Sequence, residues 1–405
     1  RSRVASADRL SNLPEELLYA ILSLLPSCWQ AVQTCVLSKR WRNVWRAMSC
    51  LHLDERLHLE ERRHGRVLPV FEDFASNLLL LPLLDAPTAL DAFRLVVTSP
   101  SDHSVQRWIR YAVARRPAVL EIQNSHPWLE IHQLALPIMD YSRYFGRLRR
   151  MRLCGVRIDA RLFAEKLGSG GGCFCPGLRL CDMRLDGRFS ASLGSSCPVL
   201  EDLELCHVEF SKITLPAVTH LTIYFCVNDL LVVAAPALTC LSCHASTVLL
   251  HATAASLLVK AYISLPAGSA KTDIQRKLLA SLFNVTSLYQ SDFDTMAMFV
   301  DEPAYGFPVF RNLKTLSIER CFSDWSDWTG KFTALGSFVQ NAPNLTKLSL
   351  CNCEFSEWEE NKIYETSTAA AQNQELSLFH CDNLEAVEIK YYYGGDLRMP
   401  DVMEG

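Results

Sequence analysis

The sequence lacks a surplus of positive charge. Its 405 residues contain 40 Lys and Arg against 44 Asp and Glu, which gives a formal net charge of −4. Proteins that hold a phosphate backbone usually carry a concentrated basic patch, because neutralising phosphates supplies most of their affinity. We therefore expect no nucleic acid among the partners of this chain.

Long apolar runs are also absent. The most apolar stretch, Leu78–Leu84, is short and is interrupted by Pro82, whereas a membrane-spanning helix needs about 20 consecutive apolar residues. No apolar segment of the signal-peptide kind opens the chain. The sequence begins with Arg1 rather than Met, so we expect a few leading residues to be missing. These absences predict no membrane partner and a location in the cytoplasm and/or the nucleus.

The 16 cysteines lack the clustered, paired spacing of a disulfide framework. Free and mostly buried thiols are the expectation. Two pairs lie one residue apart, Cys173 with Cys175 and Cys351 with Cys353. A zinc site needs Cys-x-x-Cys spacing and a matching second pair, and neither pair has them. We predict no metal ligand.

Catalytic motifs are missing as well. The sequence has no nucleophile elbow, no paired-carboxylate signature and no His-Glu-x-x-His. The glycine run at 169–172 lacks the Lys-Ser/Thr that a phosphate-binding loop requires. His52, His58 and His64 fall on a polar stretch, so we expect them to be solvated. The sequence therefore predicts no catalytic residue and no cofactor, and we do not expect an enzyme.

Three short helices are predicted between residues 13 and 48. Pro14 suits a first helical position, and two acidic residues follow it. Apolar residues then recur at the spacing of one helix face until Pro26 ends the helix. Ser27 begins a capping-box pattern for a second helix, and Ser38 can cap a third. The third helix would bury the apolar residues Trp41, Val44, Trp45 and Met48.

About forty residues in three helices cannot enclose that many large apolar side chains. Two explanations remain open from the pattern alone. The apolar stripe packs on the rest of the same chain, or the helices form a docking module for another protein.

This segment resembles the F-box of plant F-box proteins. The similarity is carried by Asp8-Arg9-Leu10-Ser11-Asn12-Leu13-Pro14-Glu15-Glu16-Leu17-Leu18, Ile21-Leu22-Ser23, Leu25-Pro26, Thr34, Leu37-Ser38-Lys39-Arg40-Trp41 and Trp45. The family's module binds the Skp adaptor of a cullin–RING ubiquitin ligase. The resemblance implies that these residues face the adaptor or support that face: Leu13, Pro14, Leu17, Ile21, Leu22, Val36, Leu37 and Trp41.

Two further points follow from the same resemblance. Trp45 is expected to pack towards the following domain rather than on the adaptor. Trp29-Gln30 departs from the family, which often has a short polar pair such as Lys-Asp before the Ala.

Beyond residue 85 a short phrase recurs, apolar-x-x-apolar-x-apolar, with the alternation of a strand at its end. Its clear copies are Leu90/Phe93/Leu95, Leu148/Met151/Leu153, Leu178/Cys181/Met183, Leu200/Leu203/Leu205, Val218/Leu221/Ile223, Leu238/Leu241/Cys243, Leu313/Leu316/Ile318, Leu345/Leu348/Leu350 and Leu384/Val387/Ile389; weaker ones lie near Leu120/Ile122 and Leu258/Ala261/Ile263. Such periodic strands are typical of leucine-rich repeats, in which each unit buries its apolar face by stacking on its neighbours. A mixed α/β domain with unrelated strands is the alternative.

Helices are expected at 108–112 and 334–340, on the convex side of the array, and 57–66 is left open as a helix or a loop. Cys226, Cys321 and Cys353 follow three of the phrases at a position that faces the interior of a repeat turn. The array also resembles plant F-box proteins of the leucine-rich-repeat, FBD-like type.

We thus predict an α/β fold class, with a three-helix F-box followed by an irregular leucine-rich-repeat solenoid whose short parallel strands line a concave face. The expected boundaries are 8–50 for the F-box, 51–89 for a linker or N-terminal cap, 90–395 for the repeats and 396–405 for a tail.

The middle residue of each phrase should lie on the concave face, where a target protein would bind. For any single position a merely solvated strand residue is the simpler interpretation. The residues are Arg94, Arg152, Asp182, Glu204, Thr222, Ser242, Tyr262, Ser317, Ser349 and Glu388.

The resemblance implies a substrate-recognition subunit of an SCF-type ubiquitin ligase, with the Skp adaptor, a cullin and an unknown target as partners. Two alternatives stay open: a scaffold that binds the adaptor without promoting degradation, and a co-receptor for a small molecule.

Overall fold

The computed structural model describes residues 13–64, 69–80, 89–98, 102–125, 134–137, 145–158, 175–183, 189, 193–195, 197–208, 212–225, 230–244, 248–251, 256–264, 272–291, 307–319, 328–352 and 381–391. Two compact units divide the chain, Arg1–Val218 and Thr219–Gly405. In the described parts of both units, parallel strands follow one another in register, each with an apolar side and a polar side.

The first unit begins with two short α-helices, α1 (Glu15–Ser23) and α2 (Cys28–Gln33). The predicted third helix differs: the chain instead forms two 3-10 turns, η1 (Thr34–Val36) and η2 (Val44–Ala47). Pro14 also lies one residue before the first helical position, where its carbonyl accepts from the backbone N–H of Leu17 and of Leu18.

Among the remaining described elements of the first unit, the helices lie between the earlier strands and the later elements are strands. These remaining elements are β1 (Cys50–Asp54), α3 (Glu55–Arg63), α4 (Phe71–Leu80), β2 (Ala92–Val97), α5 (Asp102–Ala114), β3 (Val119–Asn124), β4 (Leu134–Ala135), η5 (Phe145–Arg147), β5 (Arg150–Cys154), β6 (Val156–Arg157), β7 (Gly177–Met183), β8 (Asp202–Val208) and β9 (Lys212–Thr214). The main sheet of this unit has the order β1-β2-β3-β5-β7-β8, and every pair in it is parallel. The sheet therefore starts with β1, at the last residue of the predicted F-box segment and the first residues of the predicted linker or cap.

The second unit has the same pattern of parallel strands. Its elements are β10 (His220–Tyr224), β11 (Leu231–Ala234), β12 (Cys240–His244), β13 (Val248–Leu250), β14 (Lys260–Ser264), α8 (Thr272–Ser281), β15 (Ser287–Ser291), β16 (Thr315–Glu319), α10 (Trp328–Gln340), β17 (Lys347–Cys351) and β18 (Ala386–Lys390). The order β10-β12-β14-β15-β16-β17-β18 is again parallel throughout.

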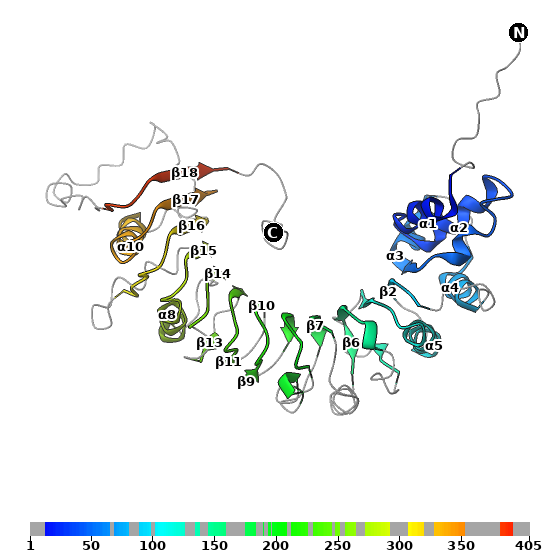
Figure 1. The fold of residues 1–405 in the computed structure, drawn as a ribbon, viewed down its shortest axis with the longest axis horizontal. Coiled ribbons are helices and arrows are strands. Elements are labelled where there is room, and N and C mark those ends of the chain that lie inside the picture. Colours follow the sequence, from blue (N-terminus) through cyan, green and yellow to red (C-terminus); the bar gives the residue numbers. More distant parts are fainter. Residues whose placement is uncertain are drawn as a thin grey trace, which may run out of the picture. The chain divides into compact units, whose positions relative to one another are not determined.

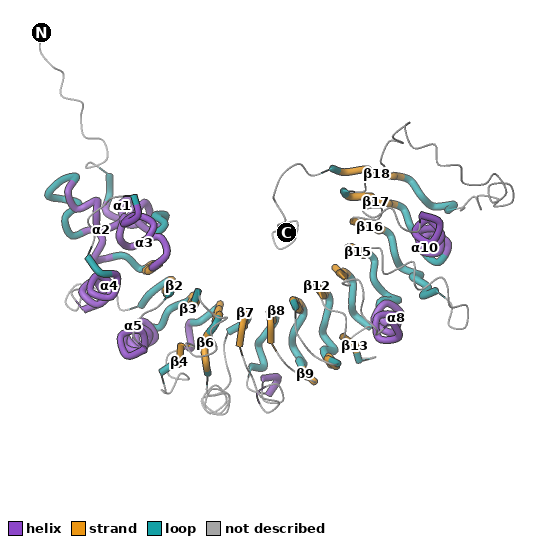
Figure 2. Tube along the Cα trace, turned by 180° about the vertical axis from the view of Figure 1, so that it is seen from behind, coloured by secondary structure: helices purple, strands orange, loops and turns teal. Residues whose placement is uncertain are grey.

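Helices cover one side of the strands in each unit. Figures 1 and 2 show α4 and α5 on the same side of the first unit's strands, and α8 and α10 on one side of the second unit's strands. The alternating apolar residues of the strands point to that side and are buried, as Phe93, Leu205 and Leu316 illustrate at 0% exposure. We call the opposite side, which carries the other strand residues, the open face. This arrangement confirms the predicted fold class and the predicted helices at 108–112 and 334–340.

Two copies of the repeat phrase need correction. In β7, Leu178 and Leu180 rather than Cys181 and Met183 occupy the inward positions, because Leu178 is in register with Met151 and Leu180 with Leu153. Four of the six residues from 178 to 183 are apolar, so the sequence fits two alternative assignments of the inward positions. Only the pairing with the neighbouring strand selects one of them. Arg179, not Asp182, is therefore the middle residue of this strand.

The last copy differs in burial. Val387 and Ile389 of β18 are 56% and 54% exposed, so this strand lacks the covered apolar side of its neighbours. β15 was missed by the sequence pattern because Gln290 occupies its second inward position, where it is fully buried.

Candidate protein-docking surfaces

The N-terminal helices enclose a small apolar core. Its buried members are Leu18, Leu22, Ala31, Trp41, Val44 and Met48, with Leu13, Tyr19, Leu25, Trp45 and Leu51 packed around them. The hydroxyl of Ser27 caps α2 by accepting from the backbone N–H of Gln30 at 3.4 Å, which confirms the predicted start of that helix. We call residues 13–48 the helical module.

Several large apolar side chains of this module remain outside its core. Leu17, Ile21 and Leu24 of α1 are 50%, 37% and 84% exposed. Their spacing of four and then three residues places them on one face of the helix. Val36 and Leu37 are 82% and 60% exposed. Burying these five side chains needs a partner surface or a part of the chain that the structure does not describe.

The residues predicted to face the adaptor divide into two groups. Pro14, Leu17, Ile21, Val36 and Leu37 are exposed, and Leu13 is half-buried. Leu22 and Trp41 are 0% and 3% exposed and belong to the module core. Burial places these two beneath the surface, where they can support a docking face, the second of the two roles that the resemblance implies. Leu24 was missed, although its spacing from Leu17 signals the same face.

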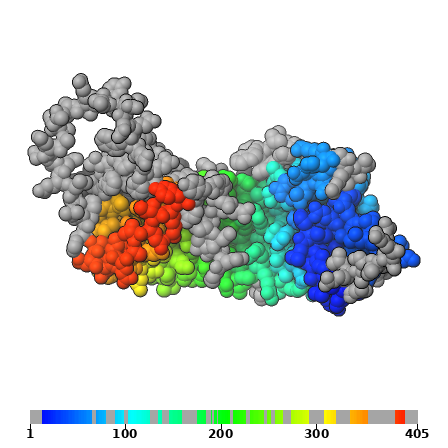
Figure 3. All heavy atoms as spheres, turned by 90° about the horizontal axis from the view of Figure 1, so that it is seen from above, coloured from blue at the N-terminus to red at the C-terminus, as the bar shows by residue number. Residues whose placement is uncertain are grey.

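Trp29, the departure from the family pattern, joins the module to the elements that follow it. Its ring makes edge contacts with His58 of α3 at 5.6 Å and with Phe74 of α4 at 5.1 Å between centroids. Phe71 then contacts Trp108 of α5 at 6.0 Å. Aromatic contacts of this kind contribute about 0.5–1.5 kcal/mol each beyond their buried area. The space-filling view of Figure 3 agrees, since the dark blue N-terminal residues lie directly against the lighter blue ones that follow.

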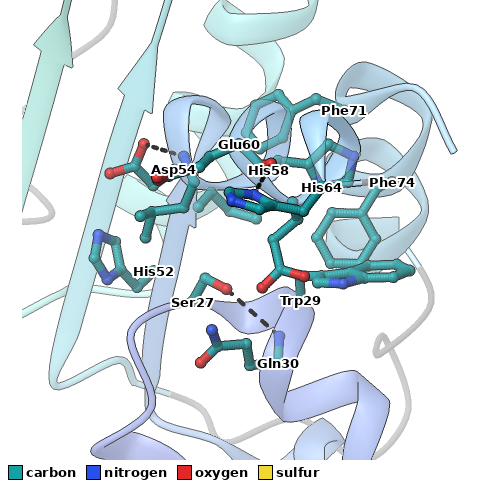
Figure 4. A pocket seen from close by; sticks show the side chains of 13 residues that line it. Ser27, Trp29, Gln30, His52, Asp54, His58, Glu60, His64, Phe71 and Phe74 are labelled. Carbon is teal, nitrogen blue, oxygen red and sulfur yellow. Dashed lines mark hydrogen bonds between the residues drawn. The ribbon is translucent and has the colours of Figure 1, made fainter. Parts of the chain in front are cut away.

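A pocket of about 480 Å³ opens beside this aromatic cluster. Figure 4 shows its lining, with Trp29 and Gln30 from α2, His52 from β1 and His58 from α3. His58 is 3% exposed and its Nε2 lies 2.9 Å from the carbonyl oxygen of Pro69, so the expectation of a solvated ring was wrong for His58. His52 is half-buried, and burial lowers its pKa.

Trp45 lies at the end of the module. It packs on the module core and lines a small cavity together with Met48, Leu78, Tyr111 and Arg115. The indole N–H donates to the carbonyl of Arg42 at 3.1 Å. That Trp45 packs towards the following domain stays a prediction.

The open face of the first unit carries charges along its middle row. Here Arg94 is in register with Glu121, Arg152 follows, and Arg179 is in register with Glu204. Two ion pairs cross the strands, Arg94 to Glu121 at 3.1 Å and Arg179 to Glu204 at 3.0 Å. Burial nevertheless raises the pKa of Glu204.

In the second unit the same row is mostly hydroxyl groups. It runs through Thr222, Ser242, Tyr262, Tyr289, Ser317, Ser349 and Glu388 in register. Tyr289 donates to Glu319 at 2.6 Å, and its ring lies 6.0 Å from that of Tyr262. Tyr289 was missed together with its strand.

Most of the predicted target-facing residues are half-buried strand residues of the open face: Arg152, Glu204, Thr222, Ser242, Tyr262, Ser317 and Glu388. Ser349 is different, because it is 3% exposed and donates to Glu388 at 3.4 Å. Ser349 therefore contacts Glu388 on the neighbouring strand, and its assignment as a target-facing residue stays a prediction. Cys226, Cys321 and Cys353 lie outside the described residues, as does the glycine run at 169–172.

Neither a metal site nor a membrane span emerges from the described ranges. No group of three or more His, Cys, Asp or Glu side chains in them is arranged to hold a metal ion. None of the helices in the same ranges is long and apolar enough to cross a membrane. The surfaces that remain for function are the exposed apolar residues of the module and the open face of the strands.

Comparison with known proteins gives relatives over almost the whole chain. The chain is 31% identical to the meiotic F-box protein MOF of Oryza sativa subsp. japonica, over 96% of this chain and 81% of that protein. It is 26% identical to a putative FBD-associated F-box protein of Arabidopsis thaliana, over 96% and 87%. An F-box/LRR-repeat protein of Arabidopsis thaliana is 28% identical over 55% of this chain and 46% of its own length. No family model matches the chain.

Proposed function

Because the chain belongs to the plant F-box/LRR/FBD family, we propose that it is the substrate-recognition subunit of an SCF-type (Skp–cullin–F-box) E3 ubiquitin ligase. The family is non-catalytic. The chain then acts by position: it holds a target near a ubiquitin thioester that another subunit carries, and raises the effective concentration of the reacting groups. We place this activity in the cytoplasm and/or the nucleus.

The exposed apolar residues of the helical module carry the proposal for adaptor binding. The module has a complete core of its own, yet five large apolar side chains stay outside it. An interface with a Skp adaptor would remove them from water, at about 25 cal/mol for each Å² of apolar surface buried. We assign direct contact to Leu13, Pro14, Leu17, Ile21, Val36 and Leu37, and add Leu24. Leu22 and Trp41 support this surface from within.

The open face of the strands is proposed to hold the target. Strand residues with fixed positions and mixed chemistry make a rigid recognition surface, since the inner strands of the sheet are paired on both sides. The first unit offers charged groups such as Arg152 and Glu204, and the second offers hydroxyl and aromatic groups such as Tyr262 and Ser317. The chemistry of this face favours a polar protein surface and names no particular target.

The experiment is a binding titration of the full chain with a purified Skp adaptor. Leu37→Glu places a charge at a 60% exposed apolar position, and burying that charge without a partner is costly. We expect affinity to fall by about 100-fold or more, with the circular dichroism spectrum unchanged. Phe283→Glu is the matched control, because Phe283 is an apolar residue of the second unit that is 48% exposed.

The outcomes separate the adaptor assignment from its alternatives. If the parent and Leu37→Glu bind the adaptor with equal affinity, the assignment of the docking surface is wrong. If the folded parent chain does not bind the adaptor, the ligase proposal itself is wrong. A chain that binds the adaptor and a cullin, but whose deletion in cells raises the level of no protein, would instead be a scaffold or co-receptor.

A further inference from the structure

Three cysteines lie side by side on neighbouring strands of the first unit. Cys154 on β5 is in register with Cys181 on β7, and Cys181 is in register with Cys206 on β8. Paired strands are about 4.8 Å apart, within the Cα separation of about 4.4–6.8 Å that disulfides tolerate. All three are free thiols. In the sequence these three cysteines are merely separate Leu-Cys pairs, and the register of the strands brings them together.

Neighbouring groups favour the thiolate of the middle cysteine. Arg179 donates through Nε to the Cys181 sulfur at 3.4 Å. The flanking thiols of Cys154 and Cys206, followed by Arg179, lower the pKa of Cys181 against the opposing effect of burial. The pKa of each flanking thiol is raised, chiefly by Cys181 and then by burial.

The other charged groups around Cys181 do not remove this effect. Asp182 is engaged on both oxygens, since Oδ1 lies 2.9 Å from Nδ1 of His207 and Oδ2 accepts from Cys154 at 3.3 Å. Glu204 pairs with Arg179. The charged and titratable groups that the described strands place around Cys181 include Arg152 and Cys154 on β5, Arg179 and Asp182 on β7, and Glu204, Cys206 and His207 on β8.

We propose that Cys181 is a modification site at which a peroxide oxidises the thiolate, and that Cys206 resolves the product into a disulfide between β7 and β8. This activity goes beyond adaptor and target binding and requires neither. Cys181 is 3% exposed, so a molecule as small as hydrogen peroxide is the expected oxidant.

The chemistry balances in two steps. The Cys181 thiolate attacks one peroxide oxygen, the O–O bond breaks, hydroxide leaves and the sulfur is oxidised to a sulfenic acid. The Cys206 sulfur then attacks the Cys181 sulfur, the S–O bond breaks, and water leaves with the proton of Cys206. In total, two thiols and one peroxide give one disulfide and two waters.

Cys206 suits the resolving role better than Cys154 does. It is half-buried rather than buried, and its contact with Nδ1 of His207, at 3.7 Å, is longer than the 3.3 Å hydrogen bond that Cys154 donates to Asp182. Oxidation of Cys181 removes both the acceptor and the negative charge that raise the pKa of Cys206, which frees its thiol to react. Side chains in register on parallel strands point the same way, so the disulfide would be strained and readily reduced. The modification is therefore expected to be reversible.

The first test uses the reduced full chain and follows the oxidation of each cysteine by hydrogen peroxide between pH 5.5 and 7.5, by site-resolved mass spectrometry. Cys351 is the internal control, because it occupies the same position on β17, is 4% exposed, and has Glu319 and Lys390 as its neighbours in register. Burial raises the pKa of Cys351. The rate at Cys181 should change less than about threefold across this range, while that at Cys351 rises roughly 100-fold. Parallel pH profiles would overturn the proposal.

The second test adds hydrogen peroxide to the full chain and maps disulfides by mass spectrometry. We expect a Cys181–Cys206 linkage that dithiothreitol removes. In Cys206→Ser, dimedone should instead trap a sulfenic acid at Cys181, while Cys351→Ser should behave as the parent does. Linkage of Cys181 to Cys154 would overturn the assignment of Cys206. Oxidation of Cys181 no faster than Cys351 would overturn the site, and because the parent chain reports this directly, the conclusion does not depend on a variant that folds.

Discussion

The helical module and the strand array place their apolar side chains in different ways. In the array, apolar residues alternate with polar ones and nearly all point to the covered side, so Leu316 is 0% exposed beside the polar Ser317. In the module, a complete core coexists with exposed Leu17, Ile21 and Val36. A strand can hide every apolar residue because each repeat stacks on the next. Among the described residues, the module of about 36 residues has no such neighbour on its outer side, and its exposed apolar residues are the basis of the proposed adaptor surface.

The comparison predicts first that substitutions in the module core lower the stability of the module, whereas substitutions on its surface lower adaptor binding alone. Trp41→Ala removes a buried ring that is 3% exposed, and we expect a loss of about 3–5 kcal/mol of stability within the module. Hydrogen exchange should accelerate at residues 13–48 and stay unchanged in β10–β17. The affinity for the adaptor should fall together with the stability of the module. If binding is lost while exchange in the module is unaltered, Trp41 touches the adaptor and its placement in the core is wrong.

The same division can be tested within one strand of the array. Leu316→Ala empties an inward position of β16 and should cost about 2–5 kcal/mol, seen as faster exchange in β15–β17. Ser317→Ala, at the adjacent position of the open face, should stay within about 0.5 kcal/mol of the parent. Both variants should bind the adaptor like the parent. Reduced adaptor binding by Ser317→Ala would break the separation between module and array.

Two adjacent leucines of α1 sharpen the comparison. Leu17 is 50% exposed and Leu18 is fully buried. Leu17→Ala should weaken adaptor binding by about 5- to 30-fold, equivalent to about 1–2 kcal/mol, with little change in stability. Leu18→Ala should destabilise the module instead. The measurements are isothermal titration with the adaptor and hydrogen exchange, and equal effects of both variants on exchange would contradict the assignment.

How far the sequence predicts the structure depends on how many neighbours each residue needs. The inward leucines, the cap at Ser27 and the helices near Trp108 and Ala334 are local patterns, and the structure agrees with them. The frame of β7 is not local, because Leu178 and Cys181 both fit the phrase until the register with Met151 decides. β15 was missed because a single buried Gln290 replaces an apolar residue.

The candidate sites follow the same rule. The exposed face of α1 can be read from its spacing, but the burial of Trp41 depends on how three segments pack together. The convergence of Cys154, Cys181 and Cys206 depends on pairing across 25 or more residues of chain. The burial of His58 depends on Trp29 and Phe74, which come from other helices. Contacts of this kind carry no periodic signal.

The smallest expected effect concerns the polar side of the array at its last strand. Glu388 on β18 lies 2.6 Å from Nζ of Lys347 and 2.9 Å from Nζ of Lys390. Hydrogen bonds from Lys347 and then from Lys390 lower the pKa of Glu388 from 4.5 to about 2. Because the folded-state pKa lies below the unfolded one, the stabilisation is present above about pH 4.5 and is lost as the pH falls towards 2.

The hydrogen-exchange rate of β18 in the parent should therefore approach that of Glu388→Gln as the pH is lowered through this window, after correction for intrinsic exchange. Solvent and salt screen this exposed cluster, so 0.5 M NaCl should narrow the difference at pH 6. If the difference in exchange rate between the parent and Glu388→Gln persists unchanged at pH 2.5, the introduced amide perturbs β18 by packing. In that case the two lysines do not stabilise the strand.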